Sequence, residues 1–371
     1  MTNKNLKELI KLFNNNKFNE IEDDIKGIRF FKLRSISRKD TIQEIAIQNN
    51  LNINNCTVNK IFELVFNNSA ISDEVINNYI LSKYKIERKK REEEEEQLIN
   101  EMYKLDIFNW GGSNGNSLEK NIVNNYVKKI KSYQQINDEI ESTLLSSLRG
   151  YTLNSWYNHW TSILIEDIFK DHKKILPTVG LIKKIDFFIQ DIPFDLKVTY
   201  FPEAFMKIKL KEKGYGVEFT QIKKICRELG ISIPKDLKDD ELKILLLKKL
   251  KEEQTSQAKE FIKKLNDIKQ EIINNSIKNP NELKIWLYEN QGEMRFDASN
   301  RFFLILINET NLSESWKLKR NIKFLRKNIN NHLDNLNIHS NQLSTSFYWK
   351  KDDKSYTCKS DILFIKLNEN S

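Results

Sequence analysis

Asp186, Asp195 and Lys197 are the residues whose types and spacing point most directly to chemistry. Carboxylate oxygens are hard ligands that suit Mg²⁺, and a neighbouring ammonium group can orient an attacking water or lower its pKa. Together the three groups could neutralise the charge of a phosphate, activate a water and place a metal ion at the leaving oxygen. These functions together equip a site to hydrolyse a phosphodiester bond, with Mg²⁺ as the cofactor.

A predicted β-hairpin brings these residues together. Two short segments rich in Ile, Phe, Val and Thr flank a turn-like segment, which is typical of two strands joined by a tight turn. Because side chains alternate along a strand, Asp195 and Lys197 share one face of the second strand. A turn centred near Asp191 then places Asp186 beside Asp195. The first strand, the turn and the second strand are predicted at residues 181–189, 190–193 and 194–201.

Helices and further strands are expected around this hairpin. A buried strand is predicted at 302–307 and another at 361–367, so the fold class is α/β (α+β), with a mixed central sheet flanked by helices. Residues 110–117 (WGGSNGNS) are the best linker candidate. They separate a helical N-terminal region, 1–110, from a second domain, 118–371. Helices are predicted at 1–105, 118–169, 316–336 and, as a Lys-rich insertion, about 205–278.

The arrangement of Asp186 followed by Asp195-Leu196-Lys197 resembles the motif of the PD-(D/E)xK nuclease superfamily, which includes most type II restriction endonucleases. Glu166 lies on the predicted helix before the hairpin, where that superfamily often carries an acidic residue near the metal. The resemblance covers roughly residues 141–202. Ile185 stands where the motif has a proline.

The resemblance implies a Mg²⁺-dependent endodeoxyribonuclease with a restriction-endonuclease-like core in residues 118–371. Asp186, Asp195 and Glu166 would bind the metal, and Lys197 would activate or position the water. The enzyme would cut double-stranded DNA at a specific sequence and leave 5′-phosphates. It would act as a homodimer on a palindromic site, with a cognate DNA methyltransferase encoded nearby as a functional partner. The N-terminal helices would serve recognition, dimerisation or partner binding.

Three alternatives stay open from the sequence. The same fold could belong to a repair, recombination or phage-defence nuclease, and phosphodiester hydrolysis does not itself distinguish DNA from RNA. The hairpin could also be structural in a non-catalytic DNA-binding protein. Other acid-x-Lys triplets occur in this Lys-rich chain, for example at 241–243 and 282–284. None of them follows an apolar strand that carries an acid on a matching hairpin.

Contacts with DNA are predicted at basic and amide side chains. A helix-turn-helix pattern at 219–250 is similar to a SAP-type DNA-binding module, or could simply pack on the core. Residues 286–301 carry side-chain types that read base edges, and the basic segment 316–320 could follow a phosphate backbone. The predicted DNA-contacting residues are Lys183, Lys223, Lys224, Arg295, Asn300, Lys317, Lys319 and Arg320.

The 371 residues carry a net charge of +9, which fits a polyanionic partner. The three cysteines, Cys56, Cys226 and Cys358, are far apart, which argues against a disulfide framework. The sequence has no apolar run near the ~20 residues that span a bilayer. A cytoplasmic protein without a membrane partner is therefore expected.

The run Glu87–Gln97 is expected to form a solvated helix with i,i+4 ion pairs.

Overall fold

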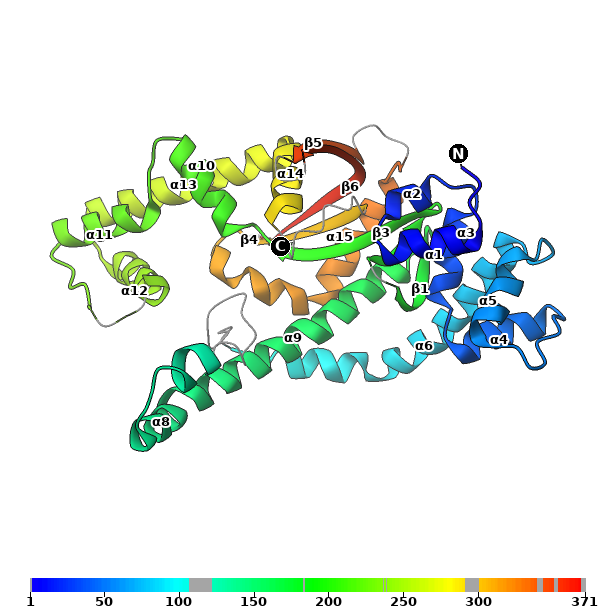
Figure 1. Cartoon of the computed structure of the whole chain (residues 1–371). Coiled ribbons are helices and arrows are strands. Elements are labelled where there is room, and N and C mark those ends of the chain that lie inside the picture. Colours follow the sequence, from blue (N-terminus) through cyan, green and yellow to red (C-terminus); the bar gives the residue numbers. More distant parts are fainter. Residues whose placement is uncertain are drawn as a thin grey trace. The chain divides into compact units, whose positions relative to one another are not determined.

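The protein is described here from a computed structural model, which combines many helices with a six-stranded mixed sheet (Figure 1). The predicted α/β class, with a helical N-terminal region, is confirmed. None of the helices described is both long and apolar enough to cross a bilayer. The structure describes residues 2–106, 122–182, 184–235, 237, 239–290, 300–338, 343–349 and 353–367.

The N-terminal region is helical as predicted, and its helices begin at residues that cap them. Asn5 forms a capping box with Glu8, and the hydroxyls of Thr57 and Ser72 accept hydrogen bonds from the first turns of their helices. Figure 1 shows the short helices gathered near the start of the long α6. The helices are α1 (Leu6–Asn14), α2 (Phe18–Glu22), α3 (Gly27–Ser35), α4 (Lys39–Gln48), α5 (Val58–Asn67) and α6 (Asp73–Met102).

The sheet has the strand order β1-β2-β3-β4-β6-β5. The pairs β1–β2, β2–β3 and β5–β6 are antiparallel, whereas β4 and β6 are parallel, so the predicted mixed sheet is present. All eight residues of β4 are buried, as expected for a central strand. The strands are β1 (Ile175–Ile182), β2 (Ile185–Ile189), β3 (Ile192–Tyr200), β4 (Arg301–Asn308), β5 (Ser344–Trp349) and β6 (Lys354–Leu367).

The strand predicted at 181–189 is wrong as a single element. Lys184 has a φ of 64°, and the chain reverses there between β1 and β2. The second turn is shorter than predicted. Only Gln190 and Asp191 lie in it, while Ile192 and Pro193 already belong to β3. The hairpin thus has three strands rather than two.

The other predicted helical regions are confirmed where the structure describes them. The predicted linker at 110–117 lies outside the described residues. The insertion at about 205–278 forms α10 (Glu203–Glu212), α11 (Glu218–Glu228), α12 (Asp239–Glu252) and α13 (Ser256–Lys278). The remaining helices are η1 (Val123–Val127), α8 (Tyr133–Glu139), η2 (Ile140–Leu144), α9 (Leu145–Lys170), α14 (Asn281–Asn290), η3 (Leu312–Arg320) and α15 (Ile322–Asn335).

The chain divides into two compact units, and each unit is assembled from two separate stretches of sequence. The first comprises Met1–Leu196 and Ser313–His339, and the second comprises Lys197–Leu312 and Ser340–Ser371. This division does not coincide with the predicted boundary near residue 110. In the first unit, side chains of the N-terminal helices share one core with Ile182, Ile185 and Phe188 of the hairpin.

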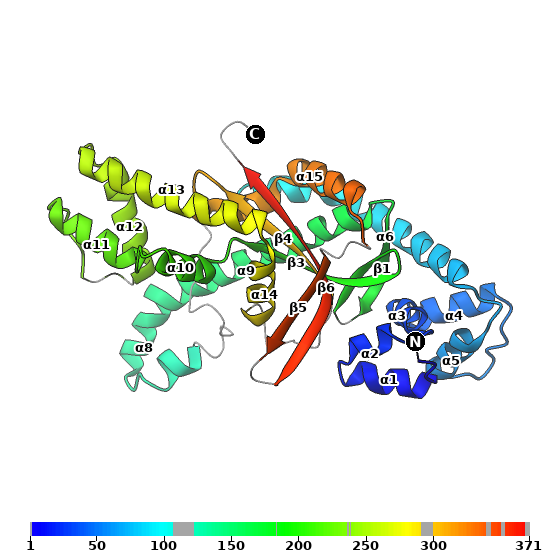
Figure 2. The same ribbon diagram turned by 90° about the horizontal axis from the view of Figure 1, so that it is seen from above.

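The second unit has two hydrophobic clusters. One joins α10, α13 and α14 to strands β4, β5 and β6. The other joins α11, α12 and the start of α13. Figure 2 shows α12 beside α11 and α13, and α14 beside β5. The Lys-rich helices therefore have a core of their own, which makes them a folded module rather than a loose insertion.

Candidate active site

The hairpin β2–β3 sets the two candidate aspartates side by side. Phe187 pairs with Phe194, and one more step of this register puts Asp186 opposite Asp195. A carboxylate oxygen of Asp186 accepts a hydrogen bond from the backbone N–H of Leu196 at 2.7 Å. Asp195 is only 6% exposed. The backbone itself thus orients the first carboxylate toward the strand that carries the second.

The turn between these strands is anchored to the N-terminal helices. Gln190 and Asp191 have φ angles of 47° and 65°, and positive φ at both positions is the requirement of a type I′ turn. The Asp191 carboxylate forms an ion pair of 2.6 Å with Lys32 of α3, whose side chain is fully buried. Because turn geometry fixes the register of a hairpin, this anchor also fixes which residues face Asp195.

Lys197 follows Asp195 by two residues on β3 and is half-buried. Because β3 is one continuous strand, the alternation of side chains puts the two groups on the same face. Phe194, between the turn and Asp195, is fully buried on the opposite face. The order acid, one residue, lysine on a strand is therefore present as the sequence predicted.

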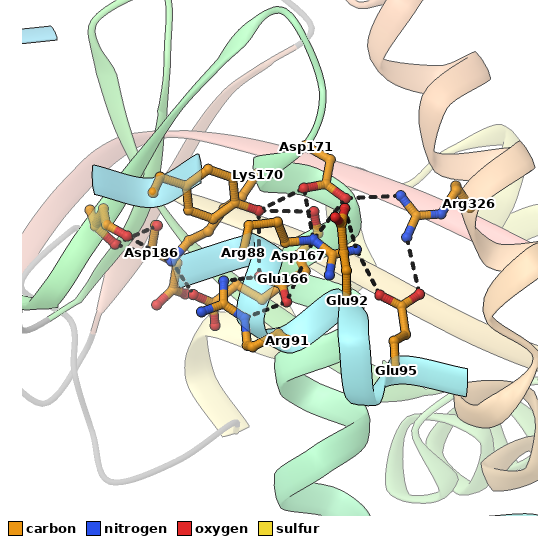
Figure 3. A network of polar contacts seen from close by, with 12 residues as sticks. Arg88, Arg91, Glu92, Glu95, Glu166, Asp167, Lys170, Asp171, Asp186 and Arg326 are labelled. Carbon is orange, nitrogen blue, oxygen red and sulfur yellow. Dashed lines mark hydrogen bonds and ion pairs between the residues drawn. The ribbon is translucent and has the colours of Figure 1, made fainter. Parts of the chain in front are cut away.

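Glu166 lies on α9 and is connected to the hairpin through Lys170. The Glu166 carboxylate pairs with the Lys170 ammonium at 2.6 Å, and that ammonium donates to the carbonyl oxygen of Thr178 at 3.0 Å. The Thr178 hydroxyl in turn donates to the backbone carbonyl of Asp186 at 2.7 Å. Figure 3 shows Glu166, Lys170 and Asp186 in this arrangement. Glu166 is thus connected to the backbone of Asp186 through a chain of polar contacts.

Ring stacking also holds α9 against the hairpin. Phe169 stacks on Phe187 with ring centroids 5.3 Å apart and planes 9° apart. Phe187 is the residue after Asp186, and both rings are fully buried. The helix that carries Glu166 is therefore fixed to the strand that carries the first aspartate.

The carboxylates near the hairpin supply some, but not all, of the ligands that a hard divalent cation needs. Asp186 and Asp195 supply two neighbouring carboxylates, and Mg²⁺ commonly binds one or two carboxylates and fills its other positions with water and phosphate oxygens. Two like charges side by side also favour a cation between them. Within the described ranges, no three His, Cys, Asp or Glu side chains come close enough together to hold a metal ion. Glu166 is therefore left out of the ligand set proposed below.

An ionic network built around the buried Arg88 and Asp167 lies next to Glu166 and was missed from the sequence (Figure 3). Arg91 of α6 donates two hydrogen bonds, of 2.8 and 2.7 Å, to the carboxylate of Asp167. Arg88 and Arg326 both donate to Asp171, at 3.0 Å. Burial by itself would raise the pKa of Asp171. The hydrogen bonds from these arginines outweigh that effect and hold the pKa below its ordinary value.

The prediction that Glu87–Gln97 forms a solvated helix is therefore wrong for one face of α6. The side chain of Arg88 is 7% exposed, and besides its i,i+4 contact with Glu92 at 3.7 Å it pairs with Glu95 at 2.7 Å. The helix is charged all round, but one side of it packs against acids of α9. Only the spacing of the arginines, 88 and 91, could have indicated a paired face.

Three of the predicted DNA-contacting residues are hydrogen-bonded within the protein: Asn300 and Lys319 are buried, and Arg320 is half-buried. The Asn300 side chain accepts from the backbone N–H of Lys359 at 2.8 Å. Lys319 donates to Asn158 at 2.9 Å, and burial lowers its pKa to about 8. Arg320 donates to the carbonyl oxygens of Met102 and Leu105. DNA cannot reach the buried Asn300 and Lys319, and the Arg320 guanidinium is already engaged by two backbone carbonyls, so these three residues are not proposed as DNA contacts.

The other predicted contacts differ in their surroundings. Lys224 is exposed on α11, and Lys317 pairs with Glu314 at 3.0 Å. Lys223 lies over the ring of Phe219, 3.8 Å from its centroid. Lys183 and Arg295 lie outside the described residues. Surface position alone does not separate these lysines from the many others in the chain.

Comparison of the chain with known protein families, with curated proteins and with solved structures gives no match in any of the three.

Proposed function

We propose that this protein is a Mg²⁺-dependent endodeoxyribonuclease of the PD-(D/E)xK type, and that it is a site-specific restriction endonuclease. The observation that carries the proposal is the hairpin, which sets Asp186 opposite Asp195 and puts Lys197 on the same strand. The basic balance of the chain supports a polyanionic substrate. Site-specificity, 5′-phosphate products and a homodimer follow from the resemblance alone.

The residues divide the chemistry among them. Asp186 and Asp195 would hold the ion, which supplies charge neutralisation at the phosphate and lowers the pKa of a bound water. The Lys197 ammonium orients the attacking water and stabilises negative charge that develops on the phosphate oxygens. The hydrogen bond from Leu196 holds the Asp186 carboxylate in place before substrate arrives. Lys170, paired with Glu166, fixes the backbone at Asp186 through Thr178.

The test is incubation of the purified full chain with long unmethylated duplex DNA, in Mg²⁺ and in EDTA. We expect discrete fragments with Mg²⁺ and none with EDTA. Asp195→Asn and Lys197→Met should each lower the cleavage rate by at least about 10²-fold, because each removes a group that acts in the transition state. Circular dichroism checks that both variants fold.

A matched control is available in a second acid-x-Lys triplet. Glu282 opens such a triplet on the helix α14, and its side chain is exposed. Glu282→Gln should cleave at the wild-type rate. A Mg²⁺-dependent smear lost in the Asp195 and Lys197 variants would favour a repair or defence nuclease. Cleavage of DNA by Asp195→Asn at the wild-type rate would refute the proposed site.

A further inference from the structure

A basic groove lies between α12 and α13, away from the hairpin in the sequence. Its volume is about 390 Å³. Lys251, at the end of α12, and Lys259 and Lys263, on α13, carry its positive charge, against a single acid, Asp267. The three lysines are exposed. The groove therefore has a net positive lining that faces solvent.

Among the described residues these three lysines have no acidic partner, whereas several other lysines of the neighbouring helices do. In the described part of the chain, none of Lys251, Lys259 and Lys263 forms an ion pair. By contrast, Lys213, Lys243 and Lys269 on the same group of helices each pair with a glutamate at 2.6 to 3.1 Å. An ammonium group without a carboxylate partner keeps its full charge for an external anion.

The groove is also built to present those charges together. Lys259 and Lys263 are four residues apart on α13, so they lie on one face of the helix, about 6 Å apart along its axis. Leu250, 1% exposed, and Ile262 form an apolar floor along which lysine stems can lie while their ammonium groups reach solvent. Asn266 adds a neutral donor three residues after Lys263.

We propose that this groove binds the phosphodiester backbone of duplex DNA. Three ammonium groups spread over two helices match a polymer with regularly spaced charges better than a single small anion. The inference rests on the proposed function for its choice of DNA. Contacts with phosphates release counterions, so they produce a steep dependence of affinity on salt. The groove adds binding energy independent of the sequence of bases.

The experiment measures binding of a fluorescent DNA duplex in EDTA, where no cleavage occurs, at several salt concentrations. The variant replaces Lys251, Lys259 and Lys263 by Gln. We expect the slope of log affinity against log salt to fall in magnitude by about 2 to 3, because each phosphate contact contributes about 0.9. At 0.1 M salt, binding should weaken by about 10²- to 10³-fold.

The control variant replaces Lys17, Lys60 and Lys104 by Gln. These lysines are more than half exposed, and each pairs with a glutamate three residues away. Both variants lower the net charge by three, so a difference between them reports position rather than total charge. The control should keep the wild-type slope.

Several results would overturn the proposal. The proposal fails if the groove variant keeps the wild-type slope, or if both variants lose DNA affinity equally. It also fails if the loss of affinity is confined to duplex RNA, or if the wild-type chain binds no DNA. Cleavage in Mg²⁺ is scored separately. A groove variant with a reduced slope, beside a wild-type chain that cuts no DNA, would keep the groove and reject the nuclease. A groove variant with the wild-type slope, beside a wild-type chain whose cleavage depends on Asp195, would keep the nuclease and reject the groove.

Discussion

The pair formed by Arg91 and Asp167 offers the sharpest test of how the site is supported. Asp167 has a side chain only 4% exposed and accepts two short hydrogen bonds from Arg91. The residue before it is Glu166, so a shift of this turn of α9 would move the Glu166–Lys170 pair. Arg91→Met keeps the length of the side chain but removes both hydrogen bonds. It leaves a buried carboxylate that has lost its closest partner.

The expected cost follows from the partners that remain. Removing one member of a buried ion pair typically destabilises by 3–5 kcal/mol, because an uncompensated charge stays behind. Arg88 still lies 3.9 Å from Asp167, and the Tyr84 hydroxyl lies 3.4 Å away. These contacts compensate part of the loss. We therefore expect a decrease of about 3 kcal/mol in the free energy of unfolding, at the low end of that range.

Urea unfolding followed by circular dichroism measures this decrease. The double variant Arg91→Met/Asp167→Leu removes both charges and should recover most of the loss. As a control, Lys60→Met breaks an exposed pair with Glu63 and should cost less than about 1 kcal/mol. A loss below about 1 kcal/mol in Arg91→Met, or a double variant no more stable than the single one, would show that Arg91 does not compensate a buried charge on Asp167.

Three further predictions concern the same unit. Burial lowers the pKa of Lys319 from 10.5 to about 8, so between these pH values the unfolded chain binds more protons than the folded one. Stability should thus rise with pH across this window, by up to about 3 kcal/mol relative to Lys319→Met, as measured by urea unfolding at pH 7.5 and 10. Gly180→Ala places a Cβ 2.4 Å from the carbonyl oxygen of Ser35, and the resulting overpacking should cost about 2 kcal/mol; an unchanged Tm would contradict this. Lys32→Met replaces a buried ammonium and frees Asp191 to solvent, so Tm should stay the same or rise while cleavage falls about 10-fold through a looser hairpin. Equal losses of stability and cleavage would reject that positioning role.

The elements that could be predicted from the sequence are those whose buried side chains form a clear apolar pattern. The strand at 302–307 is present as the fully buried β4, and the helices of the N-terminal region and of the insertion follow their Leu and Ile stripes. The strand Ser344–Trp349 was missed although its second half, Phe347–Trp349, consists of aromatic residues that favour strands; only its first half is small and polar. The predicted strand at 361–367 is the end of the longer β6, whose first four residues, Lys354–Thr357, are mostly exposed and include no aliphatic side chain. Those residues form a strand because they pair with β5.

The candidate site was only partly predictable for a similar reason. Local alternation along a strand predicts the shared face of Asp195 and Lys197, and the turn predicts the position of Asp186. The chain reversal at Lys184, by contrast, depends on a residue with positive φ that its type does not favour. Asp167, the partner of Arg91, and Asp171, a partner of Arg88, lie 76 and 83 residues away from these arginines in the chain. No local pattern could have revealed them.

The shared core of the first unit has a consequence for how the chain folds during synthesis. Helices α1–α6 emerge from the ribosome before the hairpin, yet their core includes Ile182, Ile185 and Phe188, which are made later. At about 5–20 residues per second, the ~100 residues after Ile80 that complete this core take about 5 to 20 s to appear. During that time the apolar faces of the N-terminal helices remain open to chaperones and to aggregation. The hairpin that carries the two aspartates also closes this core, so the nascent chain cannot finish folding its first helices before it has built its candidate active site.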